Sequence, residues 1–245
     1  MALWGTVVNA LSIVAGAVVG VWFSGMPERL RQTLMHGLGL AVAVIGLKMA
    51  LEMDRPLVVI ASLVIGGAIG EGLRLEDRLQ QAGARLEAWF GRGRGDIATA
   101  FVTAALVYCI GPMAVLGALE SGLRGNHAVL YLKAALDGIT AVMFSATMGI
   151  GVIFAAVAVL VYQGVIALSA HAVAAIVPDA MLQAMVGELT AVGGLLIAGI
   201  GINLLGLQRI RVGNLLPALV IAVLSVPVLP VVEAGFRVIR EGLGF

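Results

Sequence analysis

The stretch from Tyr131 to Ile176 reads YLKAALDGITAVMFSATMGIGVIFAAVAVLVYQGVIALSAHAVAAI and is apolar along almost all of its 46 residues. About 20 residues suffice for one transmembrane helix, so this tract is too long for a single straight crossing. Its length suits two helices packed as a tight hairpin. Gly149 and Gly151 are the best candidates for the turn between them. A single crossing by this tract is the alternative.

The rest of the chain has the same character. Its 245 residues are 61% hydrophobic and 12% charged, with a formal net charge of +1 and a mean hydropathy of +1.08. A soluble domain carries about 25% charged residues. This chain therefore lacks the charge to cover a water-facing surface, which excludes soluble enzymes and nucleic-acid binders.

Cysteine and histidine usage excludes other classes. The single cysteine, Cys109, rules out an intramolecular disulfide framework and a cysteine-based metal cluster. The three histidines are scattered without metal-ligand spacing, and no nucleophile–base pair or phosphate loop is present. We therefore expect no enzymatic activity, no cofactor and no bound metal.

The apolar runs predict an all-α polytopic membrane protein whose partner is the lipid bilayer, with one integral membrane domain over residues 1–245. The first run, from Trp4, has no basic segment before it and is followed by further spans, so it is a retained helix rather than a cleaved signal. The number of spans is eight if the long tract crosses twice, and seven if it crosses once. The predicted spans are 4–23, 32–51, 57–70, 97–119, 131–148, 152–176, 179–207 and 214–232.

Residues 71–90 form the most polar segment and carry a helical stripe of apolar side chains. The stripe has spacings of 4, 3, 4 and 3 residues at Leu75, Leu79, Ala82, Leu86 and Trp89. Arginines are interleaved with it. This pattern predicts an amphipathic helix lying on the cytoplasmic membrane surface.

Arginines in the loops set the expected orientation. In the eight-span model nine of them share one side, namely Arg29, Arg31, Arg74, Arg78, Arg85, Arg92, Arg94, Arg209 and Arg211. The other side has four, Arg55, Arg124, Arg237 and Arg240, or five basic residues if Lys133 is counted. The positive-inside rule then places the N-terminus outside. The seven-span model predicts the same for the N-terminus but not for the C-terminus.

An internal repeat is visible at an offset of 155 residues. Leu40–Leu51 (LAVAVIGLKMAL) aligns with Leu195–Gly206 (LLIAGIGINLLG) with identities at four of twelve positions. The first three spans would then match the last three. With eight spans the repeats are inverted, as in many secondary transporters, and with seven they are parallel.

Two carboxylates fall inside predicted spans, where ionisable groups are costly and mark functional sites. Asp137 has Lys133 one turn earlier, so a simple surface ion pair near the membrane boundary is the competing explanation. Glu188 lies about ten residues past Pro178, roughly 15 Å into its helix at 1.5 Å per residue, and has no basic sequence neighbour. Glu188 is therefore the sharper candidate for exchanging a proton or coordinating a cation.

Uncharged polar residues and a helix break complete the candidate site. Amide and hydroxyl groups inside spans bind a polar solute or an ion, or they join helices to one another. Gly111 and Pro112 interrupt the fourth span, and transporters place their sites at such breaks. The candidate binding or coupling residues are Glu188, Asp137, Asn9, Asn203, Gln163 and Ser145.

Glycine pairs four residues apart predict close helix–helix contact at Gly16/Gly20 and Gly66/Gly70. We interpret these faces as sites of self-association. The simplest homo-oligomer that they predict is a dimer.

Several segments in a fixed order resemble a known family. They include GTVVNALSIVAGAVVG, PERLRQTLMHGLGLAVAVIGLKMAL, YCIGPMAVLGALESGL, LKAALDGITAVMFSATMGIGV, ELTAVGGLLIAGIGINLLG and IRVGNLLPAL. Together they look like the YqgA-like bacterial membrane proteins, which carry the label domain of unknown function 554. The resemblance spans nearly the whole chain and implies a multi-pass protein of the bacterial inner membrane. It implies no activity.

The carboxylates, the broken span and the repeat favour a small secondary transporter, coupled to protons or another cation, for a small polar solute or ion. An oligomeric ion channel is the alternative within the same broad class. A non-transporting scaffold or accessory subunit is the alternative from a different class.

Overall fold

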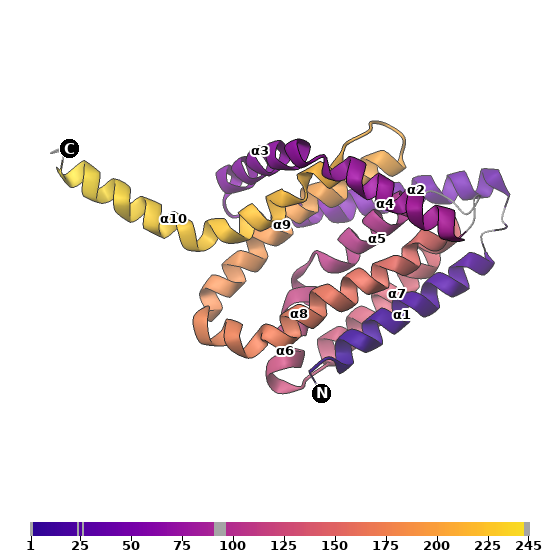
Figure 1. Ribbon diagram of the computed structural model, residues 1–245, viewed down its shortest axis with the longest axis horizontal. Coiled ribbons are helices and arrows are strands. Elements are labelled where there is room, and N and C mark those ends of the chain that lie inside the picture. The colour runs from indigo at the N-terminus through magenta and orange to yellow at the C-terminus, as the bar shows by residue number, and fades with distance from the viewer. Residues whose placement is uncertain (1, 24, 26, 91–96, 243–245) are drawn as a thin grey trace.

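The computed structural model describes residues 2–23, 25, 27–90 and 97–242, and these residues form helices and short connections (Figure 1). Two short 3-10 helices, η1 and η2, precede α8 and α10. The helices are α1 (Trp4–Trp22), α2 (Glu28–Leu51), α3 (Pro56–Leu73), α4 (Leu75–Phe90), α5 (Ile97–Cys109), α6 (Pro112–Arg124), α7 (Ala128–Met148), η1 (Ile150–Phe154), α8 (Ala155–Ile176), α9 (Asp179–Leu204), η2 (Val212–Leu215) and α10 (Pro217–Gly242).

The expectation of seven or eight spans in an all-α membrane protein is confirmed. Seven helical segments in the described ranges are long and apolar enough to cross a membrane, and an eighth crossing results if α5 and α6 together make one span. These two helices meet at a bend of 62°. Gly111 has a φ of 145°, which only glycine adopts readily, and Pro112 begins α6. The predicted span over 97–119 therefore corresponds to α5 and the first part of α6, and its break lies at Gly111 and Pro112, where the sequence places it.

The long apolar tract divides at the predicted turn. Helix α7 ends at Met148, Gly149 has a φ of 92°, and η1 leads directly into α8. The tract thus forms two long helices rather than one.

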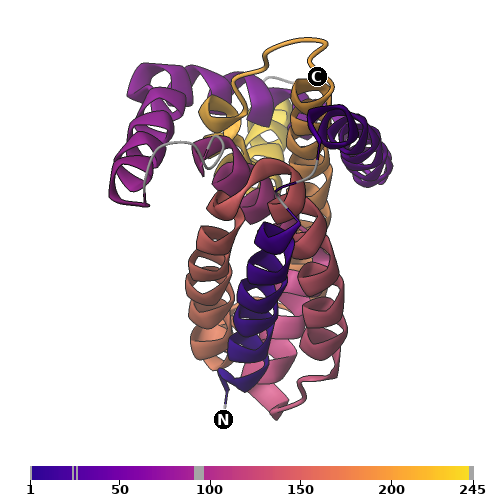
Figure 2. The ribbon, with the colours of Figure 1, turned by 90° about the vertical axis from the view of Figure 1, so that its right-hand side faces the viewer.

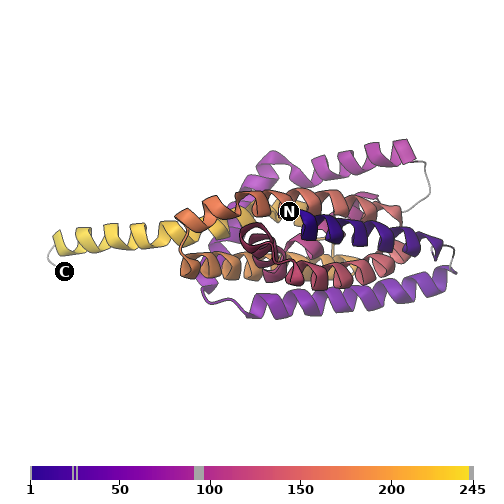
Figure 3. The same cartoon turned by 90° about the horizontal axis from the view of Figure 1, so that it is seen from below.

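Several helix bounds differ from those predicted. Helix α2 begins four residues before the predicted start, because Pro27 caps it and charged residues fill its first turn beyond the apolar run. The last candidate span is Val212–Leu229, and its helix, α10, continues to Gly242, past the predicted end at 232. Figures 1 and 3 show α10 extending beyond the other helices.

The loops gather at two ends of the bundle (Figure 2). At the N-terminal end, the Ser121 hydroxyl donates to the carbonyl of Ala2 at 2.7 Å. At the opposite end, which we call the α4 end, Arg31 Nε donates to the carbonyl of Thr147 at 2.9 Å. Hydrogen bonds also join the start of α4 to η2 there. Glu28 and Arg31 of α2 also line a pocket with Thr99 of α5 and Leu204 of α9. The start of α2, the start of α4 and the connection from α9 to α10 therefore lie at one end, where the eight-span model expects the first, third and seventh loops.

Helix α4 starts at the α4 end and is held there by the connection between α9 and α10. The backbone nitrogen of Glu76 donates to Asn214 Oδ1 at 2.7 Å, and the Glu76 carboxylate accepts from the backbone nitrogen of Gly213 at 2.8 Å. The side chains of Leu86 and Trp89, which complete the predicted apolar stripe, lie outside the described residues. The location of α4 on a membrane surface stays a prediction.

Helices α2 and α9 pack backbone to backbone. A Cβ on Gly46 would meet the backbone nitrogen of Ala198, and a Cβ on Gly201 would meet the backbone nitrogen of Ala43. These two contacts are exchanged by a shift of 155 residues, the offset of the sequence repeat. A second pair of contacts is exchanged in the same way. Gly194 lies against the carbonyl of Gly46, and Gly39, 155 residues before Gly194, lies against the carbonyl of Gly201, 155 residues after Gly46.

The two glycine faces on which the predicted dimer rests are used inside the chain. Gly16 and Gly20 lie against backbone carbonyls of α7, and Gly66 and Gly70 lie against Ala218 and Asn214. A homodimer would need another surface, and the dimer itself stays a prediction.

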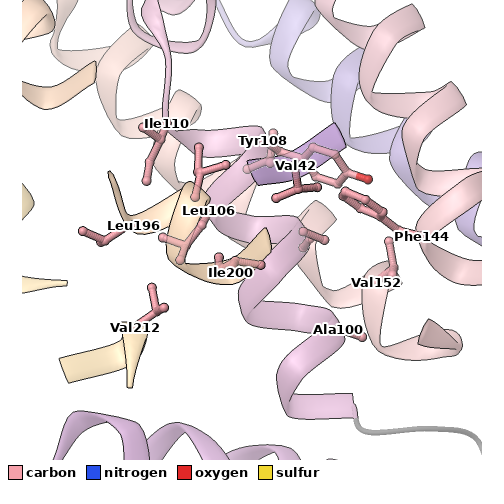
Figure 4. Close-up of a cluster of buried hydrophobic side chains, with 14 of the residues drawn as sticks. Val42, Ala100, Leu106, Tyr108, Ile110, Phe144, Val152, Leu196, Ile200 and Val212 are labelled. Atoms are coloured by element: carbon pink, nitrogen blue, oxygen red, sulfur yellow. The ribbon is translucent and has the colours of Figure 1, made fainter. Parts of the chain in front are cut away.

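The broken span occupies the interior. Tyr108 of α5 is fully buried and its ring stacks on Phe144 of α7, with 6.2 Å between centroids and 25° between planes. Figure 4 shows these rings beside apolar side chains of α2 and α9, including Val42 and Ile200. Helix α5 therefore joins the α1–α7 part of the bundle to the α2–α9 part.

We predict that Gly46→Ala lowers the melting temperature in mild detergent, because its methyl group would push α9 away from α2. Forcing extra volume into a packed interior costs about 1–3 kcal/mol. Gly37→Ala is the matched control, since it lies on the same helix and a Cβ there meets nothing within 4 Å. Equal melting of the two variants would contradict the proposed packing.

Candidate functional site

Four polar side chains from three helices meet in the interior of the bundle. Lys133 Nζ lies 2.8 Å from Asp137 Oδ2 and 3.0 Å from Asp137 Oδ1. Asn9 Nδ2 donates to Asp137 Oδ2 at 3.1 Å and to Gln163 Oε1 at 3.4 Å. We call Asn9, Lys133, Asp137 and Gln163 the polar cluster.

The polar cluster is buried inside the bundle. Asn9 and Gln163 have no exposed surface, and the side chains of Lys133 and Asp137 are 9% and 8% exposed. Asp137 lies near the middle of α7, and Gln163 lies in the interior of α8. Lys133 is thus the partner of Asp137, as the competing explanation expects, and the pair is buried within the protein rather than at its surface. Its depth in the membrane stays a prediction.

Several polar atoms at this place have no partner. Asn9 Oδ1 and Gln163 Nε2 are buried without a hydrogen bond. So is the hydroxyl of Thr6, which lies one helical turn before Asn9 on the buried face of α1. An unsatisfied buried donor or acceptor costs about 1–3 kcal/mol, so a polar species that bonded to these atoms would be stabilised here.

Small residues bring α1 and α7 close enough for the cluster to form. The Ser12 hydroxyl donates to the carbonyl of Ala134 at 2.6 Å, and Gly138 lies directly against Ser12. Gly16 in turn lies against the backbone of Gly138. This close parallel packing holds the Asn9 amide within reach of Asp137.

The structure brings together three of the six predicted binding residues, Asp137, Asn9 and Gln163. Ser145 instead donates to the carbonyl of Gly149 at 3.3 Å, where α7 ends. Asn203 exchanges two hydrogen bonds, of 2.7 and 2.8 Å, with the backbone of Ile210. These two side chains hold turns.

Glu188 lies on α9, apart from the polar cluster. It is 6% exposed and its Oε2 atom has no hydrogen-bond partner. The charged groups that act on it are Arg55 and Asp54, at the turn between α2 and α3. It is a second buried carboxylate, with different charged neighbours from Asp137.

The break at Gly111 and Pro112 lies against α9 rather than against the polar cluster. The Ile110 side chain packs onto Gly193. Beside the break is a cavity of about 520 Å³ lined by apolar side chains of α5, α6, α8, α9 and α10, among them Cys109, Tyr162 and Leu219.

The sequence analysis paired Lys133 with Asp137 but did not include Lys133 among the candidate binding residues. The signal that could have included it was its spacing of four residues from Asp137 on one helix. No such signal joins Gln163 to Asn9, because only the fold brings α8 to α1.

The polar cluster carries no net charge when both members of the ion pair are ionised. Burying two charges costs several kcal/mol per ion, and their attraction offsets this cost only with close geometry and further hydrogen bonds. The contact of Lys133 with both oxygens of Asp137 provides the close geometry, and the Asn9 amide provides a further hydrogen bond. Removing either charge leaves the other uncompensated.

The fold and this buried site define a polytopic α-helical membrane protein. A family model described as protein of unknown function (DUF554) matches residues 4–227. The chain belongs to this family, as the ordered motifs indicate.

Two relatives agree with this assignment. The chain is 31% identical over 224 residues to the uncharacterized membrane protein YdfK of Bacillus subtilis (strain 168), covering 89% of this chain and 93% of the relative. It is 30% identical over 225 residues to the uncharacterized protein YqgA of Escherichia coli (strain K12), covering 89% and 94%. No solved structure matches the chain significantly.

We predict that Lys133→Met destabilises the protein by about 3–5 kcal/mol, because it leaves Asp137 as an uncompensated buried acid. The double variant Lys133→Met/Asp137→Asn should recover most of the loss, since it removes both charges and keeps the shape. Thermal melts in detergent measure both effects. Lys48→Met, at an exposed position on α2, is the control. A double variant no more stable than Lys133→Met would show that the pair is not coupled.

Proposed function

We propose that this protein is a small secondary transporter of the bacterial inner membrane, coupled to protons or another cation, that moves a small polar solute or ion. The observation that carries the proposal is the polar cluster with its unpartnered atoms inside the bundle. Ionisable groups at membrane depth are costly and are retained where they bind or relay a substrate.

The contacts between α2 and α9 support an inverted repeat. A two-fold axis exchanges the two halves of a protein. A contact between one residue of the first half and one of the second is therefore repeated by the two residues that correspond to them. The Gly46–Ala198 and Ala43–Gly201 contacts have this relation at the sequence offset. Gly194–Gly46 and Gly39–Gly201 supply a second pair. The symmetry would relate α1–α3 to α8–α10 with opposite orientation, as in many transporters.

The polar cluster would lie on that axis. At the offset of 155 residues, Asn9 corresponds to Gly164 and Gln163 corresponds to Val8. The hydrogen-bonded pair therefore maps onto the positions next to itself on α1 and α8, as expected for residues close to the axis. A site on the axis is equally related to both halves of the protein. This placement suits a site that opens alternately to the two sides of the membrane.

We further propose that the N-terminus is outside and that the α4 end is cytoplasmic. The arginines of the first, third and seventh loops would then face the cytoplasm. Helix α4 would lie at that membrane surface. An even number of crossings would return the C-terminus to the outside.

We predict that a cysteine at Asn126, at the N-terminal end, is labelled from outside intact cells by an impermeant maleimide, and that one at Arg85 is not. Each is introduced into a Cys109→Ala background, and permeabilised cells show that both sites react. Labelling of Arg85→Cys in intact cells, with Asn126→Cys protected, would reverse the proposed orientation.

Transport is tested in proteoliposomes that contain a pH-sensitive dye and are challenged with a panel of cations, anions and neutral polar solutes. We predict saturable, solute-dependent proton movement that Asp137→Asn abolishes, because the amide cannot exchange the proton. Glu188→Gln, in the same assay, shows whether the second carboxylate takes part. Thermal melts test whether each variant is folded, so that a loss of transport is read only from folded protein.

The outcomes separate the competing functions. Single-channel current steps in planar bilayers would indicate the ion channel. A folded protein that moves none of the solutes and conducts no current would leave the scaffold. Coupled transport that survives in Asp137→Asn and fails in Glu188→Gln would move the coupling role from α7 to α9.

A further inference from the structure

The charge balance of the polar cluster restricts what can bind to it. The cluster contains one carboxylate and one ammonium group in direct contact, at 2.8 Å. Asn9 and Gln163, its other members, are neutral amides. An isolated charge in such surroundings is so unfavourable that groups neutralise instead. Any species that binds here must therefore leave the site close to neutral.

We propose that the site takes up a proton and a small monovalent anion together. In this step a proton from water adds to the Asp137 carboxylate, which becomes a neutral acid. The Lys133 ammonium loses its counter-ion and pairs with the incoming anion. The site begins and ends with no net charge. This inference rests on the proposed transport function and names the substrate class for the same site.

The hydrogen-bonding groups at the site favour an anion. Lys133 carries three N–H donors, and Asn9 and Gln163 carry two each. Of the unpartnered atoms in the cluster, Gln163 Nε2 is a donor and Asn9 Oδ1 is an acceptor. Once Asp137 is protonated, these donors outnumber the remaining acceptors, so an anion with several acceptor positions satisfies them.

A cation fits the same geometry poorly. To reach Asp137 it would have to displace Lys133 or lie next to its ammonium group, and like charges at contact distance repel strongly in a medium of low dielectric constant. A cation bound beside an ammonium would also leave the site with an excess positive charge.

Few other titratable groups act on this pair. On α5, Tyr108 and Cys109 interact electrostatically with Asp137, and Cys109 also interacts with Lys133. Both are neutral in their protonated forms. On the described parts of α1 and α8, the partners of the cluster are the uncharged Asn9 and Gln163. The pH dependence of anion binding is therefore assigned to Asp137.

The test uses the full chain in proteoliposomes with chloride, nitrate and methanesulfonate as probes, because these anions do not cross bilayers as neutral weak acids. An inward anion gradient should carry protons inward and acidify the lumen. Clamping the membrane potential at zero with valinomycin and potassium should leave the rate unchanged, since one proton and one anion move together.

Binding is measured separately by thermal melting in detergent. A bound anion stabilises the folded state by mass action. We expect chloride or nitrate, relative to gluconate, to raise the melting temperature at acid pH and to lose this effect at alkaline pH, where Asp137 keeps Lys133 occupied.

Variants of the pair distinguish this proposal from a structural role. Asp137→Asn should bind the anion at both acid and alkaline pH and exchange it across the membrane without moving protons. Lys133→Met/Asp137→Asn should fold but lose anion binding and transport to the level of empty vesicles. Lys48→Met should behave as wild type. If Asp137→Asn folds poorly, the anion should restore its melting temperature, and no restoration counts against the proposal.

Two results overturn the inference in different ways. If the wild type moves a cation or a neutral solute in an Asp137-dependent manner and none of the three anions, the transport function stands and the anion is wrong. If it moves no solute at all and no anion alters its melting, the proposed function fails as well. Anion-driven acidification that depends on membrane potential would refute the one-to-one stoichiometry.

Discussion

The close contact of α2 with α9 is the interaction on which the arrangement of the bundle depends. Lipid chains are as apolar as leucine, so membrane helices gain little from burying large apolar side chains and associate through close packing instead. Gly46, Gly194 and Gly201 allow the two backbones to touch. The small residues of α1 and α7 do the same in the other part of the bundle, and the buried α5 lies between the two parts.

This packing also explains why a polar cluster persists inside an apolar protein. An ion pair in a bilayer is stable only if its geometry is close and its remaining hydrogen-bonding groups are occupied. The contact between α1 and α7 places the Asn9 amide on Asp137, and α8 brings Gln163 to Asn9. Buried polar atoms of Thr6, Asn9 and Gln163 have no hydrogen-bond partner. An ion pair with a purely structural role does not require such atoms beside it.

The proposed symmetry and the charges of the polar cluster are consistent with one another. The glycine contacts exchange under the offset seen in the sequence, and the Asn9–Gln163 bond lies where that exchange would place an axis. A neutral ion pair at such a point can respond to a proton only by taking on a compensating charge. The proposed coupling follows from the low dielectric surroundings together with the direct contact of the two charges.

The sequence by itself determined the membrane class, the number of spans to within one, the break at Gly111 and Pro112, and three members of the site. Each of these follows from local composition, because bilayer thickness sets helix length and embedded polar residues are rare. It ranked Glu188 above Asp137 because Glu188 has no basic neighbour along the chain. Only the tertiary structure placed Asn9 and Gln163 on Asp137, moved the Lys133 pair into the interior, and assigned Ser145 and Asn203 to turns. The physical reason is that contacts between α1, α7 and α8 join residues more than a hundred positions apart, and no local pattern records which helices pack together.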